Sequence, residues 1–119
     1  MNIIFVEYPA CSTCKKAKKY LKDHDVKFID RHIVEDTPSA EELKDWWKRS
    51  GLELKKWFNT SGNVYKEMKL KDKLKDMSEE EQLSLLSSNG MLIKRPILVT
   101  EDVVYVGFKE ENYKNLCSE

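Results

Sequence analysis

The sequence has no long apolar run, no net charge and no segment rich in glycine or proline. Its 119 residues include 4 glycines and 3 prolines, and 21 basic residues balance 21 acidic ones. No apolar stretch approaches the ~18 residues that a membrane span needs. The balanced charge produces no overall field that would attract nucleic acid or a membrane surface. We therefore expect a protein without membrane contact and without a direct nucleic-acid partner.

Cysteine and histidine are also scarce, which argues against a metal centre. The chain has 3 cysteines and 2 histidines. A structural zinc site usually takes four ligands, and no second pair of ligands stands at metal spacing to complete a site with Cys11 and Cys14. We expect neither a metal nor a dissociable cofactor.

No internal repeat, low-complexity tract or linker divides the chain. Residues 1–119 are therefore predicted to form a single domain, which we expect to be monomeric, and this length buries a sizeable core without disulfides. The sequence enters an apolar strand at once, without a signal peptide. We therefore expect a cytoplasmic protein, where a pair of cysteines is catalytic or sensing rather than structural.

The most informative motif is Cys11-Ser12-Thr13-Cys14, which stands between a predicted strand and a predicted helix. The strand covers Asn2 to Val6, and the helix places Cys14, Ala17 and Leu21 on one apolar face. A strand, a turn, a Cys-x-x-Cys pair and a helix are the layout of a thioredoxin-like redox site. The motif therefore predicts thiol redox chemistry.

The two cysteines are predicted to have different roles. A thiol at the position of Cys11 meets unpaired N–H groups and the positive end of the helix dipole, which favour the nucleophilic thiolate. Cys14 lies one turn deeper, where it can resolve a disulfide formed at Cys11. A purely structural core thiol is the alternative, and it fits Cys14 better than Cys11.

The remaining pattern alternates strands and helices. A second strand is predicted over Val26 to Ile33. A helix follows, capped by Thr37 or Ser39 with Glu42, and ends at Gly51. Mostly helical segments then lead to Gly90, with a turn at 59–63 and a second capping box formed by Ser78 and Glu81. The last elements are a hairpin of strands 96–99 and 103–106 and a helix from about Glu110.

This order, β-α-β, a helical insert at about 38–90, then β-β-α, resembles that of the ArsC/Spx/MgsR family. The resemblance runs nearly end to end and is carried by four segments: Tyr8-Pro9-Ala10-Cys11-Ser12-Thr13-Cys14-Lys15-Lys16-Ala17, Phe58-Asn59-Thr60-Ser61-Gly62, Leu92-Ile93-Lys94-Arg95-Pro96-Ile97 and Val106-Gly107-Phe108. It implies an α/β thioredoxin-like fold with a mixed four-stranded sheet. We expect the strands at 3–6 and 28–32 to be parallel neighbours and the hairpin to be antiparallel to them.

The resemblance also implies roles for individual residues. Cys11 matches the nucleophilic cysteine, Arg95 matches an arginine that holds an anion beside it, and Pro96 matches the cis-proline of the fold. Lys94 and Arg95 form an anion clamp or, alternatively, an ordinary basic surface pair. The predicted catalytic residues are thus Cys11, Cys14 and Arg95. The predicted substrate-binding residues are Ser12, Thr13, Asn59, Lys94 and Pro96.

Two departures from the arsenate reductases of this family argue against arsenate as substrate. Asn59 stands where an arginine is expected in the insert, and Val104 to Phe108 supplies no second arginine. We therefore expect a thiol-disulfide oxidoreductase that acts on a sulfur or oxyanion substrate, with a low-molecular-weight thiol or a thioredoxin-type protein as reductant.

The alternative function is that of an Spx-like redox-sensing regulator that binds the RNA polymerase α subunit. Gly51 lies near the glycine of the polymerase contact in those regulators, although a helix C-cap also explains a glycine there. Cys117 is either a third redox partner or an inert thiol, which its helical phase with Tyr113 favours.

Overall fold

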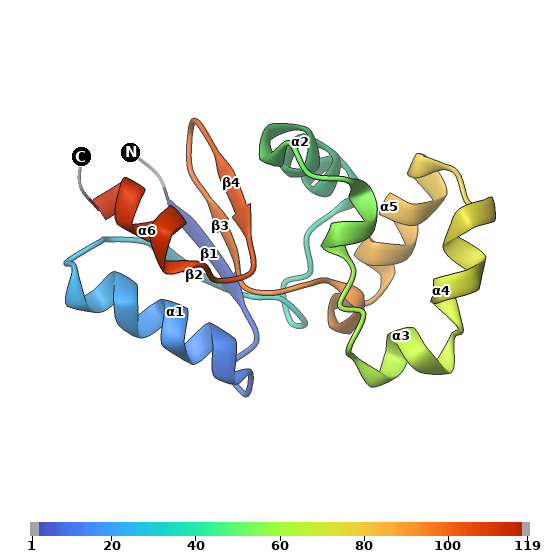
Figure 1. The fold of residues 1–119 in the computed structure, drawn as a ribbon, viewed down its shortest axis with the longest axis horizontal. Coiled ribbons are helices and arrows are strands. Elements are labelled where there is room, and N and C mark those ends of the chain that lie inside the picture. The colour runs from blue at the N-terminus through green and yellow to red at the C-terminus, as the bar shows by residue number, and fades with distance from the viewer. Residues whose placement is uncertain (1–2, 118–119) are drawn as a thin grey trace.

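The protein folds around a four-stranded mixed sheet. The computed structural model describes residues 3–117, and the side chains of residues 3–115. The strands are β1 (Ile4–Glu7), β2 (Ile29–His32), β3 (Ile97–Val99) and β4 (Val104–Val106), in the order β2-β1-β3-β4. β1 and β2 are parallel with Ile4 opposite Ile29, and β3 is antiparallel to both β1 and β4. This arrangement confirms the predicted thioredoxin-like sheet (Figure 1).

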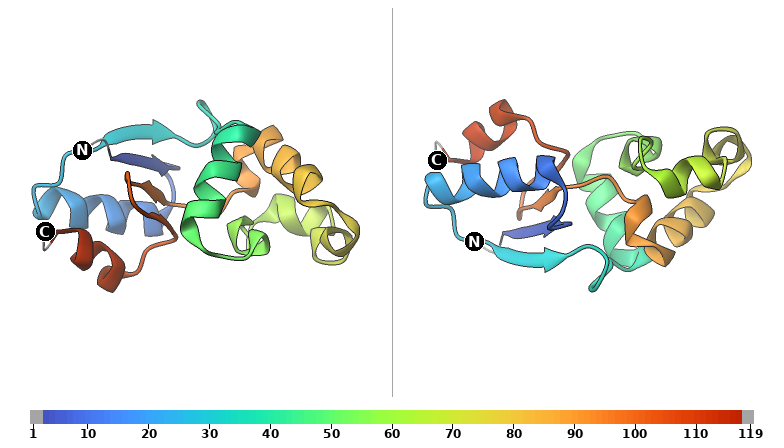
Figure 2. Two further views of the ribbon diagram at one scale, coloured as in Figure 1. Left: turned by 90° about the horizontal axis from the view of Figure 1, so that it is seen from above. Right: turned by 90° about the horizontal axis from the view of Figure 1, so that it is seen from below.

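Two helices cover one face of the sheet. They are α1 (Ser12–Asp23) and α6 (Glu110–Cys117), and they lie side by side in the views of Figures 1 and 2. The predicted apolar face of α1, formed by Cys14, Ala17 and Leu21, is fully buried. Ala17 and Leu21 pack with Tyr113 of α6 and with apolar side chains of β1 and β3. The side chain of Cys117 lies outside the described residues, so both readings of this thiol stay open.

The opposite face carries a larger core supplied by the insert. The insert comprises α2 (Ala40–Ser50), the 3-10 helix η1 (Leu54–Trp57), α3 (Asn63–Glu67), α4 (Leu70–Lys73), η2 (Leu74–Asp76), α5 (Glu79–Ser88) and η3 (Gly90–Leu92). Its buried Trp46 and Trp57 join the sheet residues Val6, Ile97 and Val104 in one cluster. α1 and α6 therefore pack on one face of the sheet and the insert on the other, while the edge strand β2 is only half-buried or exposed (Figure 2).

The predicted helix caps are confirmed. Ser39 and Glu42 form a complete capping box at α2, and Ser78 and Glu81 form a second one at α5. Each box satisfies two backbone N–H groups that a helix start leaves unpaired. Gly51 ends α2 in the left-handed conformation, with φ of 70°, so the C-cap alone is sufficient reason for a glycine there.

The end of the insert is tied to the sheet by backbone contacts. Phe58 and Ile93 form an antiparallel bridge, and the N–H of Lys94 donates to the carbonyl of Trp57 at 2.8 Å. Gly90 lies so close to β2 that a Cβ built on it would be 2.2 Å from the carbonyl oxygen of Ile33. These contacts hold the segment before β3 against the insert and against the end of β2.

Several strand boundaries differ from the prediction: β3 and β4 each begin one residue later than predicted, and β2 ends one residue earlier. β2 begins at Ile29 rather than Val26, because the chain first turns after α1, where Val26 donates its N–H to the carbonyl of Leu21 and Asp25 has φ of 56°. β1 runs one residue beyond Val6 and includes the buried Glu7. No helix in the described part of the chain is long and apolar enough to cross a membrane.

Candidate functional site

Cys11 stands at the start of α1, immediately after the loop that follows β1. It is the N-cap of the helix, and its Sγ accepts a hydrogen bond from the N–H of Cys14 at 3.4 Å. The N–H of Cys11 donates to the carbonyl of Tyr8 at 2.9 Å, which closes the loop. Cys11 is half-buried, whereas its neighbours Ala10 and Ser12 are exposed. A reacting sulfur atom can therefore reach it from solvent.

The surroundings of Cys11 favour its thiolate. Burial alone would raise its pKa. Hydrogen bonds from the Cys14 N–H, the Cys14 thiol and the Thr13 N–H outweigh that effect, and the charge of Arg95 adds to them, so the pKa lies below its ordinary value. The pattern agrees with the expected stabilisation of an anion at a helix start.

Cys14 has the opposite character although it lies on the same helix turn. Its side chain is fully buried. Burial and the neighbouring Cys11 raise its pKa to about 12, against the lowering effect of a backbone hydrogen bond at Tyr8. Both thiols are free in this structure. The pair therefore combines one thiol with a lowered pKa and one thiol with a raised pKa.

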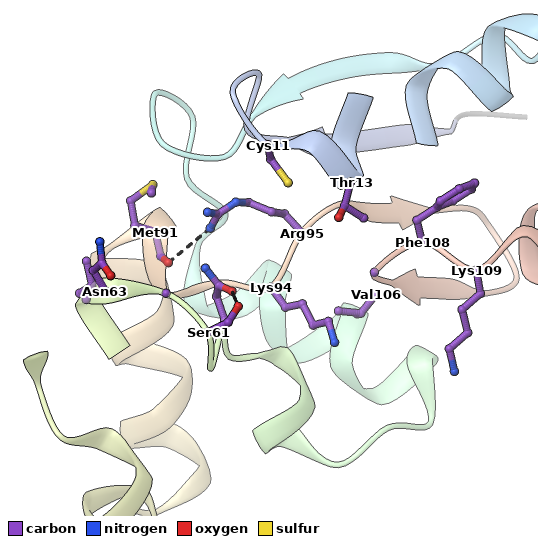
Figure 3. A pocket seen from close by; sticks show the side chains of 14 residues that line it. Cys11, Thr13, Ser61, Asn63, Met91, Lys94, Arg95, Val106, Phe108 and Lys109 are labelled. Carbon is purple, nitrogen blue, oxygen red and sulfur yellow. Dashed lines mark hydrogen bonds between the residues drawn. The ribbon is translucent and has the colours of Figure 1, made fainter. Parts of the chain in front are cut away.

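Arg95 lies beside Cys11 and is held from two sides. Its Nη1 donates weakly to the carbonyls of Met91 and Ile93, each at 3.4 Å, and its guanidinium carbon lies 5.2 Å from the centre of the Tyr8 ring. Its Nε is buried, and no partner for it exists among the described residues. Figure 3 shows the Cys11 sulfur pointing toward the Arg95 side chain, whose guanidinium reaches toward Met91.

A cavity of about 750 Å³ opens beside Cys11. It is lined by Cys11, Thr13, Asn59, Ser61, Gly62, Asn63, Val64, Met91, Lys94, Arg95, Val106, Gly107, Phe108 and Lys109. Five predicted site residues are thus brought together from three distant segments: Cys11, Thr13, Asn59, Lys94 and Arg95.

Three other predicted site residues do not line this cavity. Ser12 is exposed on the first turn of α1, and Cys14 is buried beneath that turn. Pro96 is buried where β3 begins, and the Arg95–Pro96 peptide bond is cis as predicted. Any contact of these three with a substrate stays a prediction.

Lys109 lines the cavity although it is not among the predicted site residues. The arginine that the family's arsenate reductases have near the last strand is missing from Val104 to Phe108, a segment that ends one residue before this lysine. The chain after the last strand therefore does supply a cation to the site, as a lysine in place of an arginine. The signal was present in the sequence, because Lys109 directly follows the Val106-Gly107-Phe108 motif.

The insert contributes a neutral polar wall. Asn59 donates its N–H to the carbonyl of Leu92 at 2.7 Å, and its Oδ1 accepts a hydrogen bond from Ser61 Oγ at 3.3 Å. A Cβ on Gly62 would lie 2.6 Å from Asn59 Nδ2. A larger residue at position 62 would therefore clash with the side-chain amide of Asn59. This wall offers donors and acceptors without charge. Within residues 3–115 no cluster of histidine, cysteine, aspartate or glutamate side chains could hold a metal ion.

The sheet and its helices define a thioredoxin-like fold, with Cys11 at the start of α1. Residues 6–116 match the sequence pattern of the ArsC family. The chain belongs to the ArsC family, as the resemblance predicted.

Similar proteins include both a regulator and proteins without a stated role. The uncharacterized protein YusI of Bacillus subtilis is 54% identical over 96% of this chain and 97% of its own length. The regulatory protein MgsR of the same organism is 32% identical over 90% of this chain and 83% of its own. A crystal structure from Bacteroides fragilis, described as ArsC family related, superposes with a TM-score of 0.94 at 56% identity and covers 98% of both chains.

Proposed function

We propose that this protein is a thiol-disulfide oxidoreductase in which Cys11 is the nucleophile and Cys14 the resolving cysteine. The observation that supports this proposal most strongly is the contrast between two thiols on one helix turn. The Cys11 Sγ accepts a hydrogen bond from the Cys14 N–H, and the pKa of Cys11 is lowered, whereas Cys14 is buried and has a pKa of about 12. A lowered pKa favours the thiolate, which is the nucleophilic form. A buried thiol with a raised pKa stays protonated at neutral pH and does not compete for the substrate.

The reaction would proceed in two displacements. The Cys11 thiolate attacks one sulfur of a substrate disulfide, which forms a mixed disulfide and releases the other substrate sulfur as a thiolate that takes a proton from solvent. Cys14 then loses its proton and attacks the Cys11 sulfur. The Cys11–Cys14 disulfide forms, the second substrate thiol leaves, and the protein has given two electrons to the substrate.

Arg95 would stabilise the thiolate of Cys11 before attack and after release. The Arg95 charge lowers the Cys11 pKa, and a thiol with a lower pKa is also a better leaving group. In a reducing cytoplasm a low-molecular-weight thiol or a thioredoxin-type protein would return the electrons. The exposed residues around Cys11 leave room for either reductant.

A trapping experiment tests this proposal. In Cys14→Ser the mixed disulfide cannot be resolved, so substrates from a cell lysate should remain bound to Cys11 and be released by dithiothreitol. Non-reducing gels with mass spectrometry would identify them. Cys11→Ser is the matched control and should trap nothing. Equal trapping by both variants, or none by Cys14→Ser, would refute the assigned roles.

Arsenate is expected to be a poor substrate. Asn59 provides a neutral amide where a charge-assisted contact of roughly 1.5–3 kcal/mol would otherwise hold the oxyanion. Lys109 supplies a cation to the cavity, but its side chain extends away from the Cys11 sulfur (Figure 3). A steady-state assay with arsenate, a thiol donor and a coupled reductase decides the matter, and turnover at ~1 per second or more would contradict the prediction.

A regulatory role is the second candidate, and the likeness to MgsR favours it. In that role the same cysteine pair would act as a redox switch, and the protein would bind the α subunit of RNA polymerase. Gly51 does not decide between the two candidates, because its left-handed cap conformation already calls for glycine. Calorimetry with the isolated α subunit, on the reduced and the oxidised protein, tests this candidate. Redox-dependent binding would support it, and no binding in either state would refute it.

A further inference from the structure

We propose that the aromatic ring of Tyr8 positions the guanidinium of Arg95 beside Cys11 and thereby contributes to the reactivity of that sulfur. Tyr8 is not among the residues that line the cavity, so it would act on Cys11 through Arg95 rather than by touching a substrate. The inference rests on the proposed function, because it concerns the thiol that we assign as the nucleophile. The direction of the Tyr8 ring, its fixed surroundings and the contacts of Arg95 support it.

The direction of the Tyr8 ring follows from the alternation of β1. Successive side chains of a strand point to opposite faces of the sheet. Phe5 packs in the core beneath α1, Val6 packs in the core of the insert, and Glu7 forms an ion pair with α1. Tyr8 comes next, and its half-buried ring packs against the core of the insert. The ring therefore lies on the side of the sheet that the insert covers, and the insert ends just before Arg95.

The Tyr8 ring is held in place by its neighbours. Pro9 follows Tyr8, and a residue before a proline is restricted to extended backbone conformations. The Tyr8 carbonyl also accepts the N–H of Cys11 at 2.9 Å. The ring meets the ring of His32 edge-on, with 5.8 Å between ring centres and 87° between planes. His32 is itself fixed, because its Nδ1 accepts two backbone N–H groups of the following turn, each at 3.1 Å.

Arg95 depends on this ring more than the other arginines of the chain depend on an aromatic contact. Arg31 and Arg49 each form an ion pair with a carboxylate, at 2.7 and 2.9 Å. Arg95 has no carboxylate partner among the described residues, and its hydrogen bonds to two carbonyls are long, at 3.4 Å each. Its guanidinium carbon lies 5.2 Å from the centre of the Tyr8 ring. At such a distance the face of an aromatic ring attracts a cation.

The position of the guanidinium matters for the Cys11 sulfur. Figure 3 shows this sulfur pointing toward the Arg95 side chain. Burial raises the pKa of Cys11, hydrogen bonds at the helix start lower it, and the charge of Arg95 lowers it further. The attraction between two charges weakens with distance and with the dielectric constant between them. A guanidinium that left the Tyr8 ring for the open cavity would therefore stabilise the thiolate less.

The test measures the pKa of Cys11 in ring variants. In reduced Cys117→Ser protein, peptide mapping follows the alkylation of Cys11 by iodoacetamide over a range of pH, and the midpoint of the profile gives the pKa. Tyr8→Leu removes the aromatic face and should raise this midpoint by about 0.3–0.5, a loss of thiolate of about 2- to 3-fold at neutral pH. Tyr8→Phe keeps the face and should leave the midpoint unchanged.

A double variant shows whether the effect passes through Arg95. Arg95→Met removes the charge and should raise the midpoint at least as much as Tyr8→Leu does. Tyr8→Leu added to Arg95→Met should cause no further rise. Phe28→Leu is the matched control, because Phe28 is also a half-buried ring with an edge contact, 5.4 Å from Phe5, but lies in the core beneath α1. It should leave the midpoint unchanged.

A replacement that preserves the shape of the ring separates positioning from packing. Pentafluorophenylalanine at position 8 fills nearly the same space, but its fluorines withdraw the negative charge from the ring face that attracts a cation. It should raise the midpoint as Tyr8→Leu does, whereas a ring that serves only to fill the core would not respond. This protein also keeps the inference testable if Tyr8→Leu fails to fold, which thermal melts determine for each variant.

The outcomes separate this inference from the proposed function. If the midpoint of Cys11 is low but does not move when the Tyr8 ring is changed, the inference is wrong and the oxidoreductase proposal stands. The same holds if Tyr8→Leu raises the midpoint equally without the Arg95 charge, or if Phe28→Leu raises it as much. If Cys11 titrates like an ordinary thiol with Tyr8 in place, the proposed nucleophile fails and the inference fails with it. A rise that requires both the ring face and Arg95 supports the inference.

Discussion

The two sides of the cavity are built in different ways. On one side, the reactive sulfur receives most of its stabilisation from its own helix turn, through the N–H groups of Thr13 and Cys14. On the other side, the cations and the polar wall come from segments that are far apart in sequence, around Asn59, Lys94 and Lys109. The lowered pKa of Cys11 is therefore largely a local property, whereas the lining of the cavity depends on how the insert and the hairpin pack.

This difference separates two kinds of change. A substitution near the start of α1 should alter the chemistry of the thiol while the cavity keeps its shape. A substitution where the insert meets the sheet should alter the cavity while the thiol keeps its chemistry. Four measurements test this separation, in order of decreasing expected effect.

The largest expected contrast is between Cys11 and Cys14. At pH 8 a thiol with a pKa of about 12 is ionised in only about one molecule in ten thousand. A thiol below the ordinary value of 9.0 is ionised in at least about one in eleven at that pH. In reduced Cys117→Ser protein, iodoacetamide should therefore alkylate Cys11 about a thousand times faster than Cys14. Peptide mapping over a range of pH measures both rates, and comparable rates would remove the basis for separate roles.

Gly90→Ala should weaken the docking of the insert. The new Cβ would meet the backbone of Ile33 at 2.2 Å, and backbone cannot move aside as a flexible side chain can. We expect the free energy of unfolding to fall by roughly 2–3 kcal/mol, as for other overpacked sites, measured by urea denaturation. Alkylation of Cys11 should stay fast, because Gly90 is not among the residues that lower its pKa.

Ser84→Ala, on an exposed position of α5, is the control for Gly90→Ala and should change neither property. A Gly90→Ala protein of unchanged stability would show that the insert can shift without cost. An equal loss of Cys11 alkylation would show that reactivity is not local after all.

Glu7→Gln should change how stability depends on pH. Glu7 is 3% exposed. Burial, and then a hydrogen bond with Asp30, raise its pKa to about 7 from 4.5, although Lys18, 3.2 Å away, lowers it. The folded state therefore binds a proton that the unfolded state has lost between about pH 4.5 and 7. The free energy of unfolding should consequently decrease as the pH rises through this window.

The glutamine variant lacks this titration. Relative to the natural protein it should gain about 1–2 kcal/mol at pH 8 compared with pH 5, as measured by denaturation at both pH values. Glu67→Gln removes an exposed carboxyl of α3 and should show no such difference. An identical pH slope for Glu7→Gln and the natural protein would contradict the assigned pKa. The alkylation rate of Cys11 is expected to stay unchanged.

Tyr113→Phe is expected to have the smallest effect. The Tyr113 hydroxyl is buried and has no hydrogen-bond partner among the described residues, and its ring packs against Phe108 with 4.8 Å between ring centres. Removing an unpaired buried hydroxyl should leave the free energy of unfolding unchanged or raise it by up to about 1 kcal/mol. Urea denaturation measures this change. A loss of more than about 1 kcal/mol would show that the hydroxyl has a partner in solution.

Local signals in the sequence were sufficient for much of the fold. The two capping boxes, the glycine cap at Gly51 and the apolar face of α1 each depend on residues within one or two helix turns, and each was confirmed. The start of β2 was placed too early, because the apolar Val26 and Phe28 pack against the core on the α1 side of the sheet without joining a strand.

The candidate site was only partly predictable for the same reason. Cys11 and Cys14 form a motif of fixed spacing, and Arg95 lies within one of the segments that carry the family resemblance. Lys109 was not predicted: it directly follows the Val106-Gly107-Phe108 motif, but its position in the sequence does not show that it lines the cavity. Only the turn at Gly107, with φ of 81°, and the position of Lys94 beside it bring this lysine to the cavity.

The sequence by itself therefore determined where the two thiols of the proposed site stand. A cysteine at a helix start acquires its reactivity from backbone groups a few bonds away, and three residues of spacing place the second thiol on the buried face of the same helix. The tertiary structure alone decided which charges surround that sulfur. Electrostatic contacts act through space, so they depend on the packing of the insert and the hairpin against the sheet, and no local pattern encodes that distance.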